Sequence, residues 1–113
     1  MADLDSVFII GAGKVGAGLS RALRRAGVAV TLRPQRKGLP SKRIDAPFVI
    51  LAVRDRDLQP LAERLRDARS LGHRDVVVVH CAGALGPEPL APLRSARVAV
   101  AQMHPMISFA STD

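Results

Sequence analysis

The sequence predicts an α/β protein with a doubly wound parallel sheet, and three observations lead to this prediction. Short apolar runs of strand length alternate along the chain with segments whose apolar residues recur at helical spacing. The first apolar run leads directly into a glycine-rich turn and then a helix. At 113 residues and 48% hydrophobic content, the chain has the size and composition of one globular domain. Alternating strands and helices favour parallel pairing with right-handed crossovers.

The first strand is expected at residues 6–10, and the sequence GAGKVG follows it. In this G-x-G-x-x-G pattern Gly11 allows the tight turn, Gly13 lets a pyrophosphate approach the backbone, and Gly16 lets the helix pack closely on the sheet. The next helix is expected at residues 14–26, and its first turn offers N–H groups and partial positive charge. We therefore predict a dinucleotide-binding turn, and the alternative is an ordinary strand–helix turn that binds nothing. The predicted ligands are Gly11, Ala12, Gly13, Lys14, Val15 and Gly16.

The second strand is expected at residues 28–32, and the residues after it indicate which dinucleotide is preferred. An NAD site carries an Asp or Glu there, which binds the ribose 2′-hydroxyl. This region instead has no acid and holds Arg33, Arg36 and Lys37. Arginine pairs with phosphate through its charge and two parallel hydrogen bonds. We therefore predict NADP as the cofactor, with Arg33 as the first ligand of the 2′-phosphate and Arg36 and Lys37 as further candidates. The alternative is a basic loop in solvent.

Residues 34–46 lack an apolar period and contain Gly38 and Pro40, so we expect a loop with at most one helical turn. The third strand is expected at residues 48–53. Its last residues, Ala52 and Val53, should face the cofactor, because ligands bind beyond the carboxyl ends of the strands in open α/β sheets.

An amphipathic helix is expected after the turn at residues 54–57, with apolar residues at helical spacing from Leu58 onward. Asp57 is the predicted N-cap, because Pro60 would then fall within the first turn. For Asp57 this capping role is preferred to a catalytic one. Asp55 is expected to cap or order the turn rather than to act as a base.

The fourth strand is expected at residues 76–79, a short proline-containing helix at 87–93, and the fifth strand at 98–101. The predicted strand order is 3-2-1-4-5. His80 and His104 follow the fourth and fifth strands, so we expect them at the carboxyl edge of the sheet.

His80 and His104 are the candidate catalytic residues, because a histidine can move a proton near neutral pH during hydride transfer. The alternative for each is a hydrogen bond to a loop backbone. Cys81 is a possible nucleophile, although such a cysteine also occurs as a small buried apolar residue. The sequence has no Cys/His pairs at zinc spacing, so no metal site is predicted.

The net charge is +7, and the chain has no Trp or Tyr. The arginines are scattered over the expected helix faces. Without Trp or Tyr, the chain lacks two of the aromatic side chains on which nucleic-acid bases stack. A solvated basic surface is therefore favoured over nucleic-acid binding. The apolar stretches are too short for a membrane span. One cysteine cannot form an internal disulfide and suits a reducing compartment, so we expect a cytoplasmic protein.

Four motifs carry a resemblance to a known family. The chain resembles the Rossmann-like proteins with a C-terminal DUF2520 domain, which are related to pyrroline-5-carboxylate reductase and to 6-phosphogluconate-dehydrogenase-like oxidoreductases. The motifs are IGAGKVG at residues 10–16, LAVRD at 51–55, HCAGAL at 80–85 and HPMISF at 104–109.

The resemblance implies NADP binding by the glycine turn and by Ala52, Val53 and Cys81. Members of this family continue into a helical domain that helps to form the substrate pocket and a dimer, whereas this sequence stops at Asp113. We therefore expect residues 1–113 to be a single dinucleotide-binding domain that is truncated after the fifth strand.

The function predicted from the sequence is NADP(H) binding within an oxidoreductase lineage, with hydride transfer to or from a small carbonyl or imine substrate if the chain is catalytic. The alternative is a non-enzymatic module that senses the cofactor or serves in assembly. Because exposed sheet edges tend to pair, we also expect a homodimer or a partner protein at residues 98–109.

Overall fold

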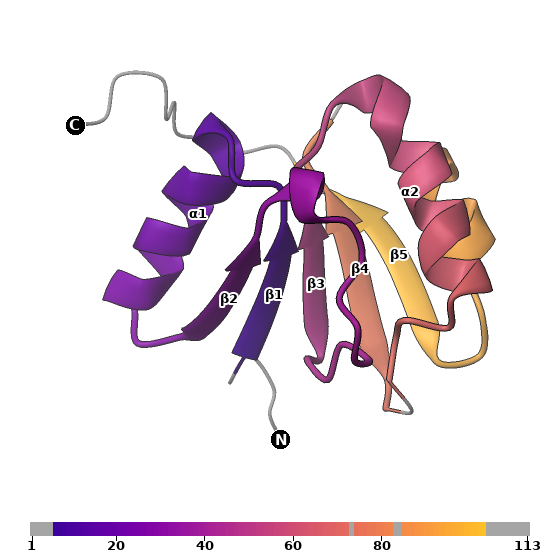
Figure 1. Ribbon diagram of the computed structural model, residues 1–113, viewed down its shortest axis with the longest axis horizontal. Helices are drawn as coiled ribbons and strands as arrows, with labels where there is room; N and C mark the ends of the chain where they lie inside the picture. Colours follow the sequence, from indigo (N-terminus) through magenta and orange to yellow (C-terminus); the bar gives the residue numbers. More distant parts are fainter. Residues whose placement is uncertain (1–5, 73, 83–84, 104–113) are drawn as a thin grey trace.

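A computed structural model of the chain describes residues 6–72, 74–82 and 85–103 and has a parallel sheet with helices on both faces (Figure 1). Within these residues the sheet has five strands: β1 (Ser6–Ile10), β2 (Ala29–Arg33), β3 (Phe48–Leu51), β4 (Val76–His80) and β5 (Val98–Gln102). The α-helices are α1 (Lys14–Arg25) and α2 (Asp55–Asp67), and short 3-10 helices are η1 (Gln35–Lys37) and η3 (Glu88–Leu93). The predicted α/β class and parallel sheet are confirmed.

The strand order is β2-β1-β3-β4-β5, so the predicted order 3-2-1-4-5 is wrong. β3 lies between β1 and β4 instead of beyond β2. The composition of the two strands explains this position. Every residue of β3 is apolar and most are buried, whereas β2 carries Thr31 and Arg33 and has no buried residue. An all-apolar parallel strand needs cover on both faces, whereas a strand with polar residues is tolerated at an edge.

The connection from β2 to β3 makes this order possible. Residues 34–47 contain the single turn η1 and no α-helix, as predicted. Leu39 and Ile44 of this connection pack in the same core as Phe8 of β1, so the connection crosses in front of β1 (Figure 1). The observed order equals the six-strand order 3-2-1-4-5-6 with its third strand omitted. The topological switch point therefore lies between β1 and β3.

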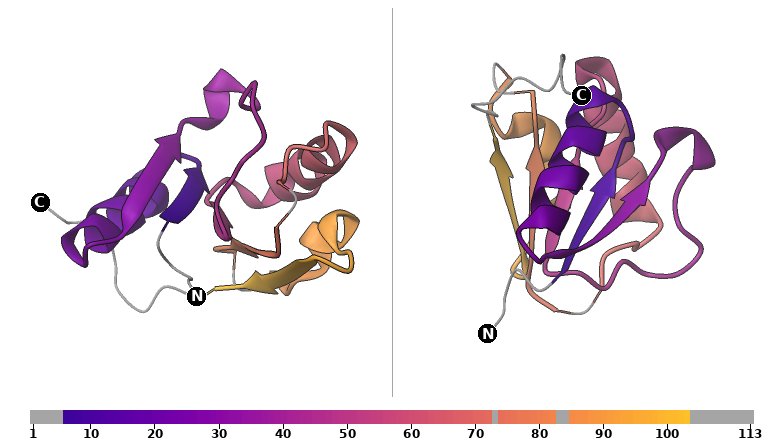
Figure 2. Two further views of the ribbon diagram at one scale, coloured as in Figure 1. Left: turned by 90° about the horizontal axis from the view of Figure 1, so that it is seen from below. Right: turned by 90° about the vertical axis from the view of Figure 1, so that its left-hand side faces the viewer.

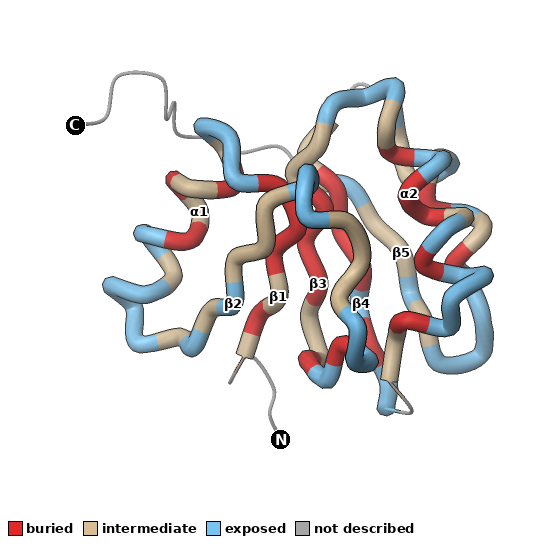
Figure 3. Tube along the Cα trace, viewed as in Figure 1, coloured by how far each residue is buried: buried red, intermediate tan, exposed pale blue. Residues whose placement is uncertain are grey.

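The two α-helices lie on opposite faces of the sheet (Figure 2). α2 and η3 cover β3, β4 and β5, and buried residues concentrate between these layers (Figure 3). On the other face α1 covers β1 and β2. Among the described residues, no helix combines the length and the apolar character that a bilayer crossing requires. The main core contains Leu51, Leu58, Leu65, Val78 and Leu90, and the smaller core contains Val7, Ile9 and Ile50.

The start of α2 differs from the prediction. The helix begins at Asp55 with Arg54 as its N-cap, and no side chain caps it, so the prediction of Asp57 as N-cap is wrong. The Asp57 carboxylate instead accepts a hydrogen bond of 3.1 Å from the side-chain amide of Gln35 in η1. Pro60 lies inside the helix and has no N–H to donate to the carbonyl of Arg56. Both residues are exposed, so water can bond this carbonyl instead.

Two neighbouring valines of β4 test the assignment of the sheet faces. Val78 is fully buried on the α2 side, whereas Val77 points to the other face with 36% exposure. We expect Val78→Ala to lower the free energy of unfolding by about 2 kcal/mol, since it removes apolar contacts and leaves a cavity. The matched variant Val77→Ala should cost less than half as much. Urea denaturation measures both, and equal losses would contradict the face assignment.

Candidate functional site

The predicted site lies at the carboxyl edge of the sheet, where β1 and β3 end side by side. Two backbone hydrogen bonds continue beyond the strands at this point. The N–H of Gly11 donates to the Arg33 carbonyl at 2.9 Å, and the N–H of Ala52 donates to the Ile10 carbonyl at 2.8 Å. These bonds hold the glycine turn against the ends of β2 and β3.

Gly11 and Gly16 are required by backbone packing within the turn. Gly11 has φ = +114°, and a Cβ placed there would lie 2.2 Å from the carbonyl oxygen of Ala52. A Cβ on Gly16 would lie 1.8 Å from the carbonyl oxygen of Gly11. Both obstacles are backbone atoms, which cannot rotate away as a flexible side chain can. The absence of two side chains therefore lets α1 start directly above the ends of β1 and β3.

Gly13 differs from the other two glycines. It is the N-cap of α1 with φ = −73°, it is exposed, and a Cβ there would meet nothing within 4 Å. The protein itself thus imposes no steric need for glycine at this position. No side chain caps α1 and its first turn holds no acid, so its N–H groups and the positive end of its dipole are open to an anion.

The remaining predicted residues of the turn surround this helix start. Ala12 and Lys14 are exposed, and Val15 is half-buried. Lys14 adds a positive charge at the open helix end. The turn therefore combines backbone donors, an unobstructed surface and a cation, which suits a phosphate group.

The Arg33 guanidinium is engaged by the loop that follows β2. Its Nε donates to the Gly38 carbonyl at 2.7 Å, and its Nη2 donates to the carbonyls of Lys37 and Leu39 at 2.9 and 3.2 Å. These bonds fold residues 34–39 around the arginine. Arg36 and Lys37 lie on the resulting turn with exposed side chains. The structure therefore brings all three predicted cations to one loop, with Arg33 holding the backbone and the other two facing solvent.

Ala52, Val53 and Cys81 lie at the ends of β3 and β4, as predicted. Ala52 and Cys81 pack on the α1 side of the sheet, whereas Val53 packs on the α2 side. Burial raises the pKa of the Cys81 thiol to about 11, because a thiolate would lose hydration there. At neutral pH the thiol is protonated, so this geometry favours the interpretation of Cys81 as a half-buried apolar residue.

His80 is fully buried at the end of β4, and both of its ring nitrogens have partners. Nδ1 accepts a hydrogen bond of 2.9 Å from the N–H of Ala82. Nε2 lies within hydrogen-bond distance of the Gly86 carbonyl, which can only accept, so Nε2 carries the proton. Because neither nitrogen is left for a substrate, the geometry favours the interpretation that His80 shapes the loop after β4.

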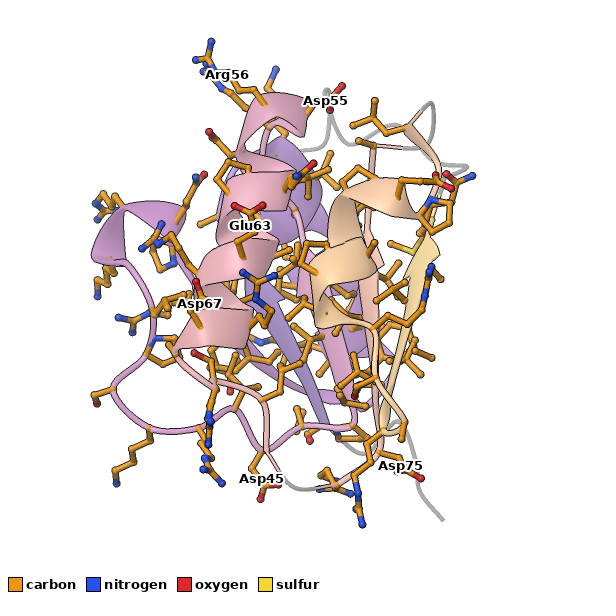
Figure 4. All side chains as sticks on the ribbon, turned by 90° about the vertical axis from the view of Figure 1, so that its right-hand side faces the viewer. Asp45, Asp55, Arg56, Glu63, Asp67 and Asp75 are labelled. Atoms are coloured by element: carbon orange, nitrogen blue, oxygen red, sulfur yellow. The ribbon has the colours of Figure 1, made fainter. Side chains whose placement is uncertain are left out.

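The second candidate, His104, lies outside the described residues. The chain leaves β5 close to His80, since the N–H of Met103 donates to the His80 carbonyl at 2.7 Å. Asp55 lies at the start of α2 with an exposed side chain, beside Arg56 (Figure 4). Within the described ranges, no group of three or more His, Cys, Asp and Glu side chains is placed to hold a metal ion.

Two open grooves of about 810 and 770 Å³ lie away from the glycine turn, and both include residues 94–98 at the start of β5. The start of α1 at the glycine turn is exposed at Ala12, Gly13 and Lys14. Sequence reasoning missed two contacts in this region: the packing of the Ala52 carbonyl against Gly11, and the hydrogen bond from the Gln35 amide in η1 to Asp57 in α2. A backbone carbonyl leaves no signature in residue type, and the partner of Gln35, Asp57, is distant in sequence.

No protein-family model matches the chain, and a comparison with curated proteins found no match either. The function therefore has to be inferred from the site itself.

Alanine substitutions in the turn should separate its structural glycines from Gly13. We expect Gly16→Ala to lower the free energy of unfolding by about 1–3 kcal/mol, because its Cβ would overlap the Gly11 carbonyl. Gly13→Ala should lower it by only about 0.5 kcal/mol, since its Cβ meets open space and the cost is that of alanine at an N-cap position. Thermal and urea unfolding of the two variants measure this difference, and equal effects would show that the turn is arranged otherwise.

The reactivity of Cys81 should follow its raised pKa. With a pKa of about 11 against a usual 9.0, the thiolate fraction at pH 8 is lower by about a hundredfold. We expect iodoacetamide to alkylate the folded chain correspondingly slower than the urea-unfolded chain, with the rate still rising above pH 10. The chain has one cysteine, so mass spectrometry reports this site alone. A folded-state rate that levels off near pH 7 would contradict this assignment.

Proposed function

We propose that the chain is a dinucleotide-binding domain that holds NADP(H) with its diphosphate over the glycine turn. The observation that carries the proposal is the contrast among the three glycines. Gly11 and Gly16 are required by the fold, whereas Gly13 faces open space at the uncapped start of α1. A glycine that the protein does not need for its own packing fits a surface that a diphosphate approaches closely.

The basic loop after β2 supports the preference for NADP(H) over NAD(H). The adenosine ribose of a dinucleotide on this turn lies toward the end of β2. Arg36 and Lys37 offer exposed cations there, and Arg33 fixes the loop that carries them. In the proposed complex Arg36 and Lys37 bind the 2′-phosphate, and Arg33 positions them while its own charge adds to the local field.

The proposed nicotinamide end lies at Ala52, Val53 and Cys81, beyond the ends of β3 and β4. A bound NADPH would supply a hydride, and the oxidoreductase lineage that the sequence motifs resemble favours a small carbonyl or imine as acceptor. The apolar side chains at this end would exclude water from the nicotinamide ring.

A non-enzymatic role as a cofactor sensor or assembly module is the second candidate. The described residues place both ring nitrogens of His80 in backbone hydrogen bonds and keep the Cys81 thiol protonated. Neither side chain is then available as an acid, a base or a nucleophile. These observations favour binding of the cofactor without turnover by the described residues.

Calorimetric titration of the chain with NADPH and with NADH tests the proposal. We expect NADPH to bind at least about tenfold more tightly, because the loop cations pair with its additional phosphate. Gly13→Ala should weaken both cofactors, since its Cβ would stand where the diphosphate approaches. The double variant Arg36→Ala/Lys37→Ala should weaken NADPH about tenfold and leave NADH unchanged.

Arg25→Ala is the matched control for lost charge, because Arg25 is exposed at the opposite end of α1 from the glycine turn. It should leave both affinities unchanged. Absence of binding by either dinucleotide would overturn the proposed site. Equal affinities that the double variant does not alter would overturn only the preference for NADP(H).

A further inference from the structure

The two edges of the sheet differ in how well they are protected. β5 forms one edge, and its sequence VAVAQ carries no charge and has no buried position (Figure 3). At the other edge, β2 carries Arg33, and the Val30 carbonyl accepts a hydrogen bond of 3.1 Å from Arg24 Nη2. Charged and capped edges resist strand pairing, whereas an uncharged apolar edge of the same length is open to it. Among the residues that the structure describes, the β5 edge is therefore the one that is open to another strand.

The backbone groups that β5 presents can be assigned from its bonds to β4. The Arg97 carbonyl accepts from the N–H of Val76 at 2.9 Å, and the N–H of Met103 donates to the His80 carbonyl at 2.7 Å. Successive residues of a strand direct their N–H and C=O groups to alternate sides. Val100 and Gln102 each lie an odd number of residues from Arg97 and from Met103, whose polar groups face β4. Their polar groups thus point away from β4, toward the open edge.

The two ends of this edge carry opposite charges. A Cβ built on Gly86 would lie 2.8 Å from Glu88 Oε1 and 3.9 Å from Gln102 Oε1, so Glu88 lies beside the carboxyl end of β5. Arg94 follows η3 directly before the turn that enters β5, and so lies at the amino end. Both side chains are exposed, and neither forms an ion pair within the described part of the chain.

We propose that a second copy of this chain pairs with the β5 edge, with the two β5 strands antiparallel about a two-fold axis near Ala101, so that Val100 of each copy lies opposite Gln102 of the other. The outward groups of Val100 and Gln102 then form hydrogen bonds between the copies, and the two sheets become continuous. Antiparallel pairing sets Glu88 of each copy against Arg94 of the other. This arrangement is self-complementary, so the assembly closes as a dimer and leaves the protected β2 edges outside.

Sedimentation analysis of charge-reversal variants tests the dimer. We expect the unmodified chain to be dimeric at micromolar concentration. Glu88→Arg and Arg94→Glu should each raise the dissociation constant by about tenfold or more, because two attractive pairs become repulsive. An equimolar mixture of the two variants should associate again. The Glu88→Arg variant carries cations at positions 88 and 94, and the Arg94→Glu variant carries carboxylates at both. In the mixed dimer each of the two pairs across the interface is therefore attractive.

Two further variants distinguish the edge from the face of the sheet. Gln102→Pro removes an outward N–H from an exposed residue, so it should weaken the dimer and leave the ladder to β4 intact. Val77→Lys changes the exposed apolar face and should leave the dimer intact. A monomeric unmodified chain, a mixture of charge variants that stays monomeric, or dissociation by Val77→Lys alone would each overturn the proposal.

Discussion

The structure depends on a backbone contact at the switch point of the sheet. Gly11 packs against the carbonyl of Ala52, and Gly16 packs against the carbonyl of Gly11. These contacts leave no room for a methyl group, so two missing side chains set the distance between α1 and the ends of β1 and β3. The start of α1 is thereby fixed above the turn with its N–H groups exposed. Any anion-binding role of this domain follows from that geometry.

The composition of β3 places the switch point between β1 and β3. Because all four residues of β3 are apolar, the strand is stable only where both faces are covered. It therefore lies beside β1, and β2 becomes an edge strand. The connection at residues 34–47 then has to cross in front of β1. Its basic turn η1 lies near the glycine turn because it directly follows β2, whose Arg33 lies opposite Ile10 of β1. One apolar strand thus sets the topology, and the pairing of β2 with β1 sets the place of the cations.

Several side chains that suggest chemistry serve the structure of the loops around the site. Arg33 binds three carbonyls of its own loop, and His80 binds backbone groups on both sides of its ring. Buried polar groups are costly unless they are paired, so a loop that must turn sharply benefits from such partners. The groups left for a ligand are the backbone donors of α1 and the exposed cations of η1. This division suits binding better than it suits acid–base catalysis.

The sequence by itself determined the α/β class, the parallel sheet, the glycine turn and the single helical turn in residues 34–46. Each of these follows from local signals, namely apolar periodicity and the positions of glycine and proline. Only the tertiary structure decided the strand order, the start of α2 at Asp55 and the partners of Arg33 and His80. These features depend on which segments compete for the same buried space and which carbonyls lie nearby. Residue types alone do not encode such distances.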